Sequence, residues 1–153
     1  MEKNFRKEAS LSIIKDTQHN KFLMIRHHRG INEGCINFPG GKKELGETME
    51  ECVIRETFEE TGIRIKNPIQ VGYIEFPNVN FYVHVFLSTE YSGEIKENKA
   101  EVNAFWQDAD NIPYSEMREA DKDFLPDILS GQYVKRRYIY DEKFAIKEII
   151  NLD

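Results

Sequence analysis

The chain has 153 residues, of which 40% are hydrophobic and 12% aromatic, so it is long enough for one domain with a core and is not expected to be disordered. Its formal net charge of −6 disfavours a broad electrostatic grip on nucleic acid polymers, because such binding needs a basic surface. No apolar run is long enough to span a membrane, and two cysteines make no disulfide framework.

The N-terminal segment is charged and has no apolar h-region, so a secretory signal is not expected. Cys35 and Cys52 fit two reduced thiols of a cytosolic protein. We therefore predict a cytoplasmic protein, a monomer or homodimer, whose partners include neither a membrane nor a nucleic acid polymer.

The first part of the chain predicts two strands and a loop. Residues 9–16 and 21–27 read as strands, and residues 17–20 read as the turn between them. Residues 29–41 hold four glycines and predict a long flexible loop.

A helix is strongly marked over Met49–Thr61. Thr48 with Glu51 three residues later predicts a capping box, in which each side chain binds the other residue's backbone N–H. Gly62 followed by Ile63 is typical of the glycine and apolar contact that end a helix.

The rest of the chain is mostly strand-like. Residues 133–140 and 143–152 predict strands near the C-terminus. Residues 115–131 are helix-prone at both ends, but Pro126 is expected to break the middle. Further strands are expected at 63–76, 80–91 and 101–107, the first two separated by Pro77-Asn78. We predict an α+β or mixed α/β fold in a single domain spanning residues 1–153.

Three glutamates share one face of the predicted helix. Glu59 and Glu60 follow Glu56 by three and four residues, and Arg55 could pair with Glu59 on a solvated acidic surface. Alternatively the carboxylates are partly buried, which is costly unless a cation joins them. Hard oxygen ligands at this spacing suit Mg²⁺ or Mn²⁺, which can bridge to phosphate oxygens.

The stretch from Gly41 to Ile63 resembles the Nudix box. The matching positions are Gly41, Glu47, Arg55, Glu56, Glu59, Glu60, Gly62 and Ile63. Thr57 stands at a position that is apolar in the family, which we expect to loosen a packing contact slightly. The resemblance implies a mixed sheet sandwiched between helices, with the box as loop–helix–loop, and hydrolysis of a nucleoside diphosphate linked to another group.

The resemblance also implies roles for particular residues. Mg²⁺, or Mn²⁺ in its place, would be bound by ligands that are expected to be Gly40 through its carbonyl, Glu56, Glu59, Glu60 and Glu101. The residues expected to act in catalysis are Glu59, Glu60, Arg55 and Glu101; Arg55 would orient a glutamate, and Glu101 would help to activate water. Glu47 would brace the loop or reach metal through water.

Segments 83–93, 101–117 and 123–126 resemble the branch that includes mammalian 8-oxo-dGTP diphosphatase. In that comparison Asn37 matches the asparagine that reads the purine, and Asp121 matches one of two acidic residues that read the base edge. His27, Gly41 and Lys42 are further candidates for substrate binding.

This chain departs from that branch around the base. Ala120 replaces the second acidic residue, and Arg118 replaces a base-stacking tryptophan. Arg118 could stack on a base through its guanidinium plane or be an ordinary surface residue. Ile36 and His27 replace a tryptophan and a lysine of the branch.

These observations predict a metal-dependent nucleoside triphosphate pyrophosphohydrolase that converts oxidised purine nucleotides such as 8-oxo-dGTP to the monophosphate and pyrophosphate. One alternative is an ADP-ribose or ADP-sugar pyrophosphatase, weakly favoured by Pro77, which lies fourteen residues after Ile63. A second alternative, from a different class, is a non-catalytic nucleotide-binding module.

Overall fold

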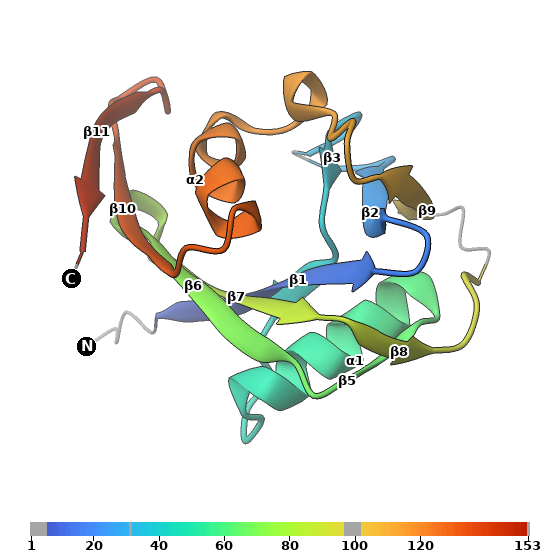
Figure 1. Ribbon diagram of the computed structural model, residues 1–153. Coiled ribbons are helices and arrows are strands. Elements are labelled where there is room, and N and C mark those ends of the chain that lie inside the picture. Colours follow the sequence, from blue (N-terminus) through green and yellow to red (C-terminus); the bar gives the residue numbers. More distant parts are fainter. Residues whose placement is uncertain (1–5, 31, 97–101, 153) are drawn as a thin grey trace.

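The computed structural model describes residues 6–30, 32–96 and 102–152, and Figure 1 shows a layered α+β fold. A mixed sheet forms the middle layer, with helix α1 (Met49–Thr61) on one face and helix α2 (Glu119–Leu129) on the other. Within the described ranges no helix has the length and apolar character needed to cross a membrane. The layered arrangement confirms the predicted fold class.

In the described part of the chain, nine strands belong to the main sheet. Its order is β11-β10-β6-β7-β1-β2-β3, with β4 also paired to β1 and β9 to β2. The strands are β1 (Lys7–Asp16), β2 (Lys21–His27), β3 (Ile36–Asn37), β4 (Gly40–Lys42), β6 (Ile69–Phe76), β7 (Phe81–Ser88), β9 (Val102–Asp108), β10 (Val134–Tyr140) and β11 (Ile146–Asn151). Two short strands, β5 (Arg64–Lys66) and β8 (Glu90–Ser92), pair separately.

Strand β1 lies at the centre and is buried on both faces. It runs parallel to β7 and antiparallel to β2 and β4. Because successive strand side chains point to opposite faces, Leu11 and Ile13 join the core beneath α2, whereas Ile14 joins the core beneath α1. Ser10 and Ser12 alternate with the first two and are also buried. The strand therefore links the two cores.

Helix α1 begins and ends where the sequence predicts. The Thr48 hydroxyl accepts from the Glu51 N–H at 3.1 Å, and the Glu51 carboxylate accepts from the Thr48 N–H at 2.9 Å. Gly62 adopts a left-handed backbone, with φ of 84°, and its N–H donates to the Phe58 carbonyl. The capping box and the terminal glycine are confirmed.

Two predictions about regular structure were wrong. The expected loop at 29–41 contains β3 and the start of β4, because Gly40 and Gly41 pair with β1. Pro126 does not break α2, in which it is an exposed residue. Phe124, Leu125 and Ile128 bury their side chains against the sheet, and this packing outweighs the local cost of the proline.

Gly62 and Gly131 offer a matched pair for testing the end of α1. Both have positive φ, but a Cβ at Gly62 would lie 2.8 Å from the Glu94 carbonyl oxygen, whereas a Cβ at Gly131 would meet no atom within 4 Å. We expect each alanine variant to lose about 1 kcal/mol from the strained backbone, with a larger loss for Gly62→Ala because of the clash. Urea unfolding followed by circular dichroism measures both, and equal losses would contradict the expectation.

Candidate active site

Arg55 lies among the acidic residues of α1 and of the loop before it. Its Nε and Nη2 donate to the two carboxylate oxygens of Glu47 at 2.6 and 3.0 Å. Its Nη1 donates to Glu56 at 2.8 Å and to Glu59 at 3.1 Å. One guanidinium therefore binds and orients three carboxylates while offsetting only part of their charge, and its contact with Glu59 is the one that the i,i+4 spacing predicts.

Glu47 braces the loop before α1. One of its oxygens accepts from the Glu44 N–H at 3.0 Å, and both accept from Arg55. The Arg55 hydrogen bond holds the pKa of Glu47 down, at about 2. Arg55 also donates to the Lys42 carbonyl at 3.0 Å, so the same side chain ties β4 to the helix.

Strand β4 lies so close to α1 and β1 that only glycine fits at two positions. A Cβ on Gly41 would lie 2.3 Å from the carboxyl carbon of Glu56, and a Cβ on Gly40 would lie 2.0 Å from the Ser10 carbonyl oxygen. The Gly40 N–H donates to the Glu60 carboxylate at 2.8 Å. The backbone of β4 therefore touches two of the three predicted metal-binding glutamates that lie on α1.

The three glutamates differ in exposure. The Glu56 side chain is 17% exposed, and burial raises its pKa. The Glu59 side chain is 55% exposed, more than the sequence predicts for a partly buried cluster. Among the described residues no three acidic, histidine or cysteine side chains converge as a ready-made metal site. Glu101 lies outside the described residues.

The side chains present nonetheless fit a hard divalent cation. Glu56, Glu59 and Glu60 supply carboxylate oxygens, the ligands that Mg²⁺ and Mn²⁺ prefer. The Glu56 carboxylate is largely buried against Gly41, and burial raises its pKa, so a cation beside it would offset the cost of its charge. The Gly40 contact seen here is through its N–H, so its carbonyl as a ligand stays a prediction.

A cavity of about 620 Å³ begins at β4 and extends under α2. Its lining includes all five predicted substrate-binding residues, namely His27, Asn37, Gly41, Lys42 and Asp121. These residues come from β2, β3, β4 and α2, so the fold brings together positions that are far apart in the sequence. The cavity therefore places the predicted base-reading residues next to the strand that contacts the glutamates.

Asp121 is a buried residue among those that line this mostly apolar cavity. It is 7% exposed, and its Oδ2 has no hydrogen-bond partner among the described residues. Burial raises the pKa of Asp121 to about 6. Asn37 uses its Oδ1 to accept from the Phe38 N–H at 2.7 Å, which leaves its amide NH₂ to donate to a ligand.

Arg118 lies at the mouth of this cavity. Its Nη1 donates to the side-chain oxygen of Asn32, which also lines the cavity. Arg118 is exposed, yet this bond makes it part of the cavity rim, so it is more than an isolated surface residue.

Burial lowers the pKa of His27, and the nearby Arg118 and His28 charges lower it further. Ala120 is buried in the core beneath α2.

Sequence reasoning missed the aromatic wall of the cavity. Phe76 stacks on Tyr140, with ring centroids 6.0 Å apart and planes 11° apart. Phe144, in the turn before β11, and Val79 complete this wall. No local pattern marks these residues, because parallel pairing of β10 with β6 brings them together.

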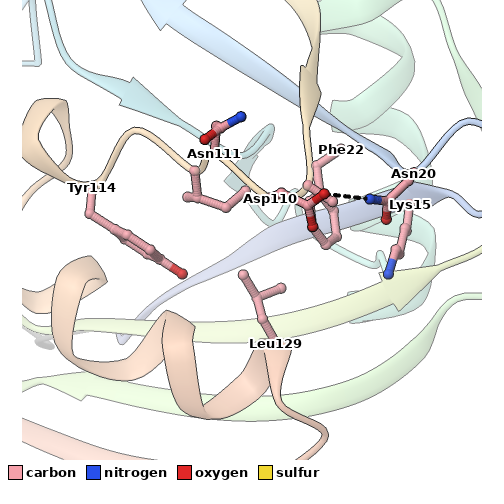
Figure 2. A pocket seen from close by; sticks show the side chains of 9 residues that line it. Lys15, Asn20, Phe22, Asp110, Asn111, Tyr114 and Leu129 are labelled. Atoms are coloured by element: carbon pink, nitrogen blue, oxygen red, sulfur yellow. Dashed lines mark hydrogen bonds between the residues drawn. The ribbon is translucent and has the colours of Figure 1, made fainter.

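A second hollow of about 490 Å³ lies near the other end of α2 (Figure 2). Asn20 donates to Asp110 at 3.3 Å beside it, and Phe22, Tyr114 and Leu129 supply apolar surface. None of the predicted site residues that the structure describes lines this hollow. The larger cavity is therefore the candidate active site.

Known proteins share this sequence pattern and fold. Residues 6–128 match the NUDIX domain family. An oxidized purine nucleoside triphosphate hydrolase of Danio rerio is 31% identical over 144 residues, which cover 92% of this chain and 89% of that protein. An ADP-ribose pyrophosphatase of Methanocaldococcus jannaschii is 36% identical over 98 residues, which cover 61% of this chain and 58% of that protein. A crystal structure of a MutT protein from Bacillus halodurans superposes with a TM-score of 0.79 and 27% identity, covering 94% of this chain and 96% of that one.

The raised pKa of Asp121 predicts a pH-dependent loss of stability. Below its ordinary value of 3.8 the carboxyl is protonated in both the folded and the unfolded chain, whereas between 3.8 and about 6 only the unfolded chain readily ionises. Stability should therefore fall as pH rises through this window. Asp121→Asn stays neutral, so we expect its unfolding temperature to exceed that of the wild type increasingly from pH 4 to pH 7.

Thermal unfolding at several pH values between 4 and 7 measures this difference. Glu119→Gln is the control, because Glu119 lies on the same helix with a side chain that is 77% exposed. A profile for Asp121→Asn that runs parallel to the wild type would contradict the expected burial effect.

Proposed function

The chain belongs to the Nudix hydrolase family, and we propose that it is a metal-dependent pyrophosphohydrolase of nucleoside triphosphates that prefers oxidised purine nucleotides such as 8-oxo-dGTP. One observation carries this proposal. The cavity that contains Asn37 and Asp121 is continuous with Gly40 and Gly41 of β4, which touch the glutamates of α1. A base and its phosphates can therefore occupy the two ends of one site.

The metal would be Mg²⁺ or Mn²⁺, held by Glu56, Glu59 and Glu60, with the Gly40 carbonyl and Glu101 as further candidate ligands. When bound, such an ion neutralises phosphate charge and makes a coordinated water more acidic. Arg55 already contacts Glu56 and Glu59, so it can help to orient both carboxylates. Lys42 and His27 would lie along the phosphates.

At the base end, Asn37 and Asp121 would read the purine. The Asn37 amide NH₂ can donate to a carbonyl oxygen of the base, and Asp121 can donate or accept according to its protonation. A buried polar atom without a partner is costly, so a ligand that satisfies Asp121 Oδ2 gains binding energy. The Danio rerio relative, an oxidized purine nucleoside triphosphate hydrolase that aligns over 92% of this chain, supports the assignment.

ADP-ribose is the alternative substrate. The Methanocaldococcus jannaschii relative is an ADP-ribose pyrophosphatase, but its similarity covers only 61% of this chain. Pro77, which weakly favoured this alternative in the sequence, begins a short 3₁₀ helix over Pro77–Val79 beside the cavity wall.

A substrate panel separates these activities. The purified protein with Mg²⁺ should convert 8-oxo-dGTP to the monophosphate and pyrophosphate with a higher kcat/KM than dGTP or ADP-ribose, as expected from its similarity to the oxidized purine nucleoside triphosphate hydrolase of Danio rerio. Chromatography of the nucleotide products together with a pyrophosphate assay identifies the bond that is cut. Faster turnover of ADP-ribose would replace the proposed substrate, and turnover of no nucleotide would favour the binding module.

The glutamate roles predict large and selective effects. We expect Glu59→Gln or Glu60→Gln to lower kcat at least about 100-fold, because a neutral amide is a poor ligand for a hard cation. Glu50→Gln is the control, since Glu50 is an exposed residue in the first turn of the same helix. Steady-state kinetics measure kcat, and circular dichroism checks that the fold is retained. Full activity in both Glu59 and Glu60 variants would overturn their assigned roles.

A further inference from the structure

A row of buried polar side chains lies between β1 and α1, directly behind the acidic residues. Ser12 and Thr57 have no exposed surface, and Ser10 is 3% exposed. Cys52, also fully buried, lies 3.5 Å through its Sγ from both the Ser10 Oγ and the Gly41 carbonyl oxygen. Polar groups are rare in such a position unless they are satisfied, so their contacts bear directly on how α1 sits.

Thr57 makes the shortest of the contacts between this helix and β1. Its Oγ1 lies 2.8 Å from Ser12 Oγ and 2.6 Å from the Val53 carbonyl oxygen. Each hydroxyl has one hydrogen, so both bonds form together only if Thr57 donates to Val53 and accepts from Ser12. The two hydroxyls satisfy each other at a site that water does not reach.

Ser12 connects this bond to the glycine strand. Its backbone N–H donates to the Pro39 carbonyl at 2.7 Å, and the next residue, Gly40, donates its N–H to Glu60. A closed path of contacts therefore runs from Thr57 through Ser12 and Pro39 to Gly40 and back to α1. Thr57 follows Glu56 directly and precedes Glu60 by three residues, so any rotation of the helix about its axis moves both carboxylates.

Threonine stands at position 57 in place of an apolar residue, and the sequence predicted that it would loosen packing. That prediction was wrong, because the side chain is fully buried and makes two hydrogen bonds. An apolar side chain packs without a preferred direction, whereas a hydrogen bond weakens steeply when its angle changes. We propose that Thr57, through its bond to Ser12, is a positioning residue that fixes the rotation of α1 and thereby aims Glu56 and Glu60 at the metal. This inference rests on the proposed metal-dependent function.

The experiment compares removal of one partner with removal of both. Thr57→Val leaves the Ser12 hydroxyl buried without its Thr57 partner, which should lower stability, whereas in Ser12→Ala the Thr57 hydroxyl keeps its bond to the Val53 carbonyl and the loss should be smaller. The double variant leaves neither hydroxyl and should recover much of that stability. If the bond positions the glutamates, the double variant will remain defective toward metal although it is stable again.

Two further variants serve as controls. Thr61→Val removes a hydroxyl one turn later that is equally buried, and its hydrogen bonds within the described residues go to the Thr57 carbonyl and the Ile63 N–H rather than to β1. Thr57→Ser keeps the hydroxyl and should rescue the wild-type behaviour. Mn²⁺ binding measured by electron paramagnetic resonance without nucleotide, and the Mg²⁺ concentration that gives half-maximal kcat, are the readouts beside thermal unfolding.

We expect Thr57→Val and the double variant to weaken Mn²⁺ binding about tenfold and to raise the Mg²⁺ requirement similarly, as when a residue that orients metal ligands is lost. Thr61→Val and Thr57→Ser should match the wild type. Wild-type metal binding in the double variant, or an equal defect in Thr61→Val, would overturn the positioning role alone. A wild-type protein that neither binds Mn²⁺ nor hydrolyses nucleotide would overturn the proposed function and this role with it.

Discussion

The close approach of β4 to its neighbours is the constraint on which the site depends. Gly40 lies against the Ser10 carbonyl of β1, and Gly41 lies against the Glu56 carboxylate, each at a distance that leaves no room for a Cβ. Because β1 is the central strand, this contact links the helix that bears the glutamates to the middle of the sheet. The residues of β4 also line the cavity, so the two ends of the candidate site share this strand.

The carboxylates that bind Arg55 differ in how their surroundings shift their pKa values. Glu47 and Glu56 both bind Arg55, yet their pKa values move in opposite directions. For Glu47 the paired hydrogen bonds from Arg55 dominate and favour the ionised form, whereas for Glu56 burial dominates and opposes it. Of these two carboxylates, Glu56 is therefore the one that gains more from an added cation.

The local features of the site could be predicted from the sequence. The capping box, the terminal glycine and the shared face of the glutamates depend on residues within one or two helical turns, where spacing alone fixes geometry. The aromatic wall from Phe76 and Tyr140, the short strands β3 and β4, and the uninterrupted α2 depend on contacts between distant segments. Thr57 was misjudged because its partner, Ser12, lies 45 positions earlier in the chain.

Residues proposed to bind metal and residues proposed to bind the base also differ in how they are distributed along the sequence. Gly40, Glu56, Glu59 and Glu60 lie in one continuous stretch, so a substitution there is expected to alter reactivity directly. The end of the cavity proposed to bind the base draws on β2, β3, α2 and the C-terminal hairpin, and it is here that Arg118 and Ala120 depart from the related branch.

Ala120 faces the core and cannot replace the missing acid, so Asp121 is the buried carboxylate that this cavity offers among the described residues. Arg118 donates a hydrogen bond to Asn32 at the rim of the cavity. It places a charged guanidinium where the related branch has a tryptophan ring, so a directional polar contact takes the place of ring stacking. Substrate preference in this chain should therefore be governed more by the protonation of Asp121 and the position of Arg118 than by the box itself.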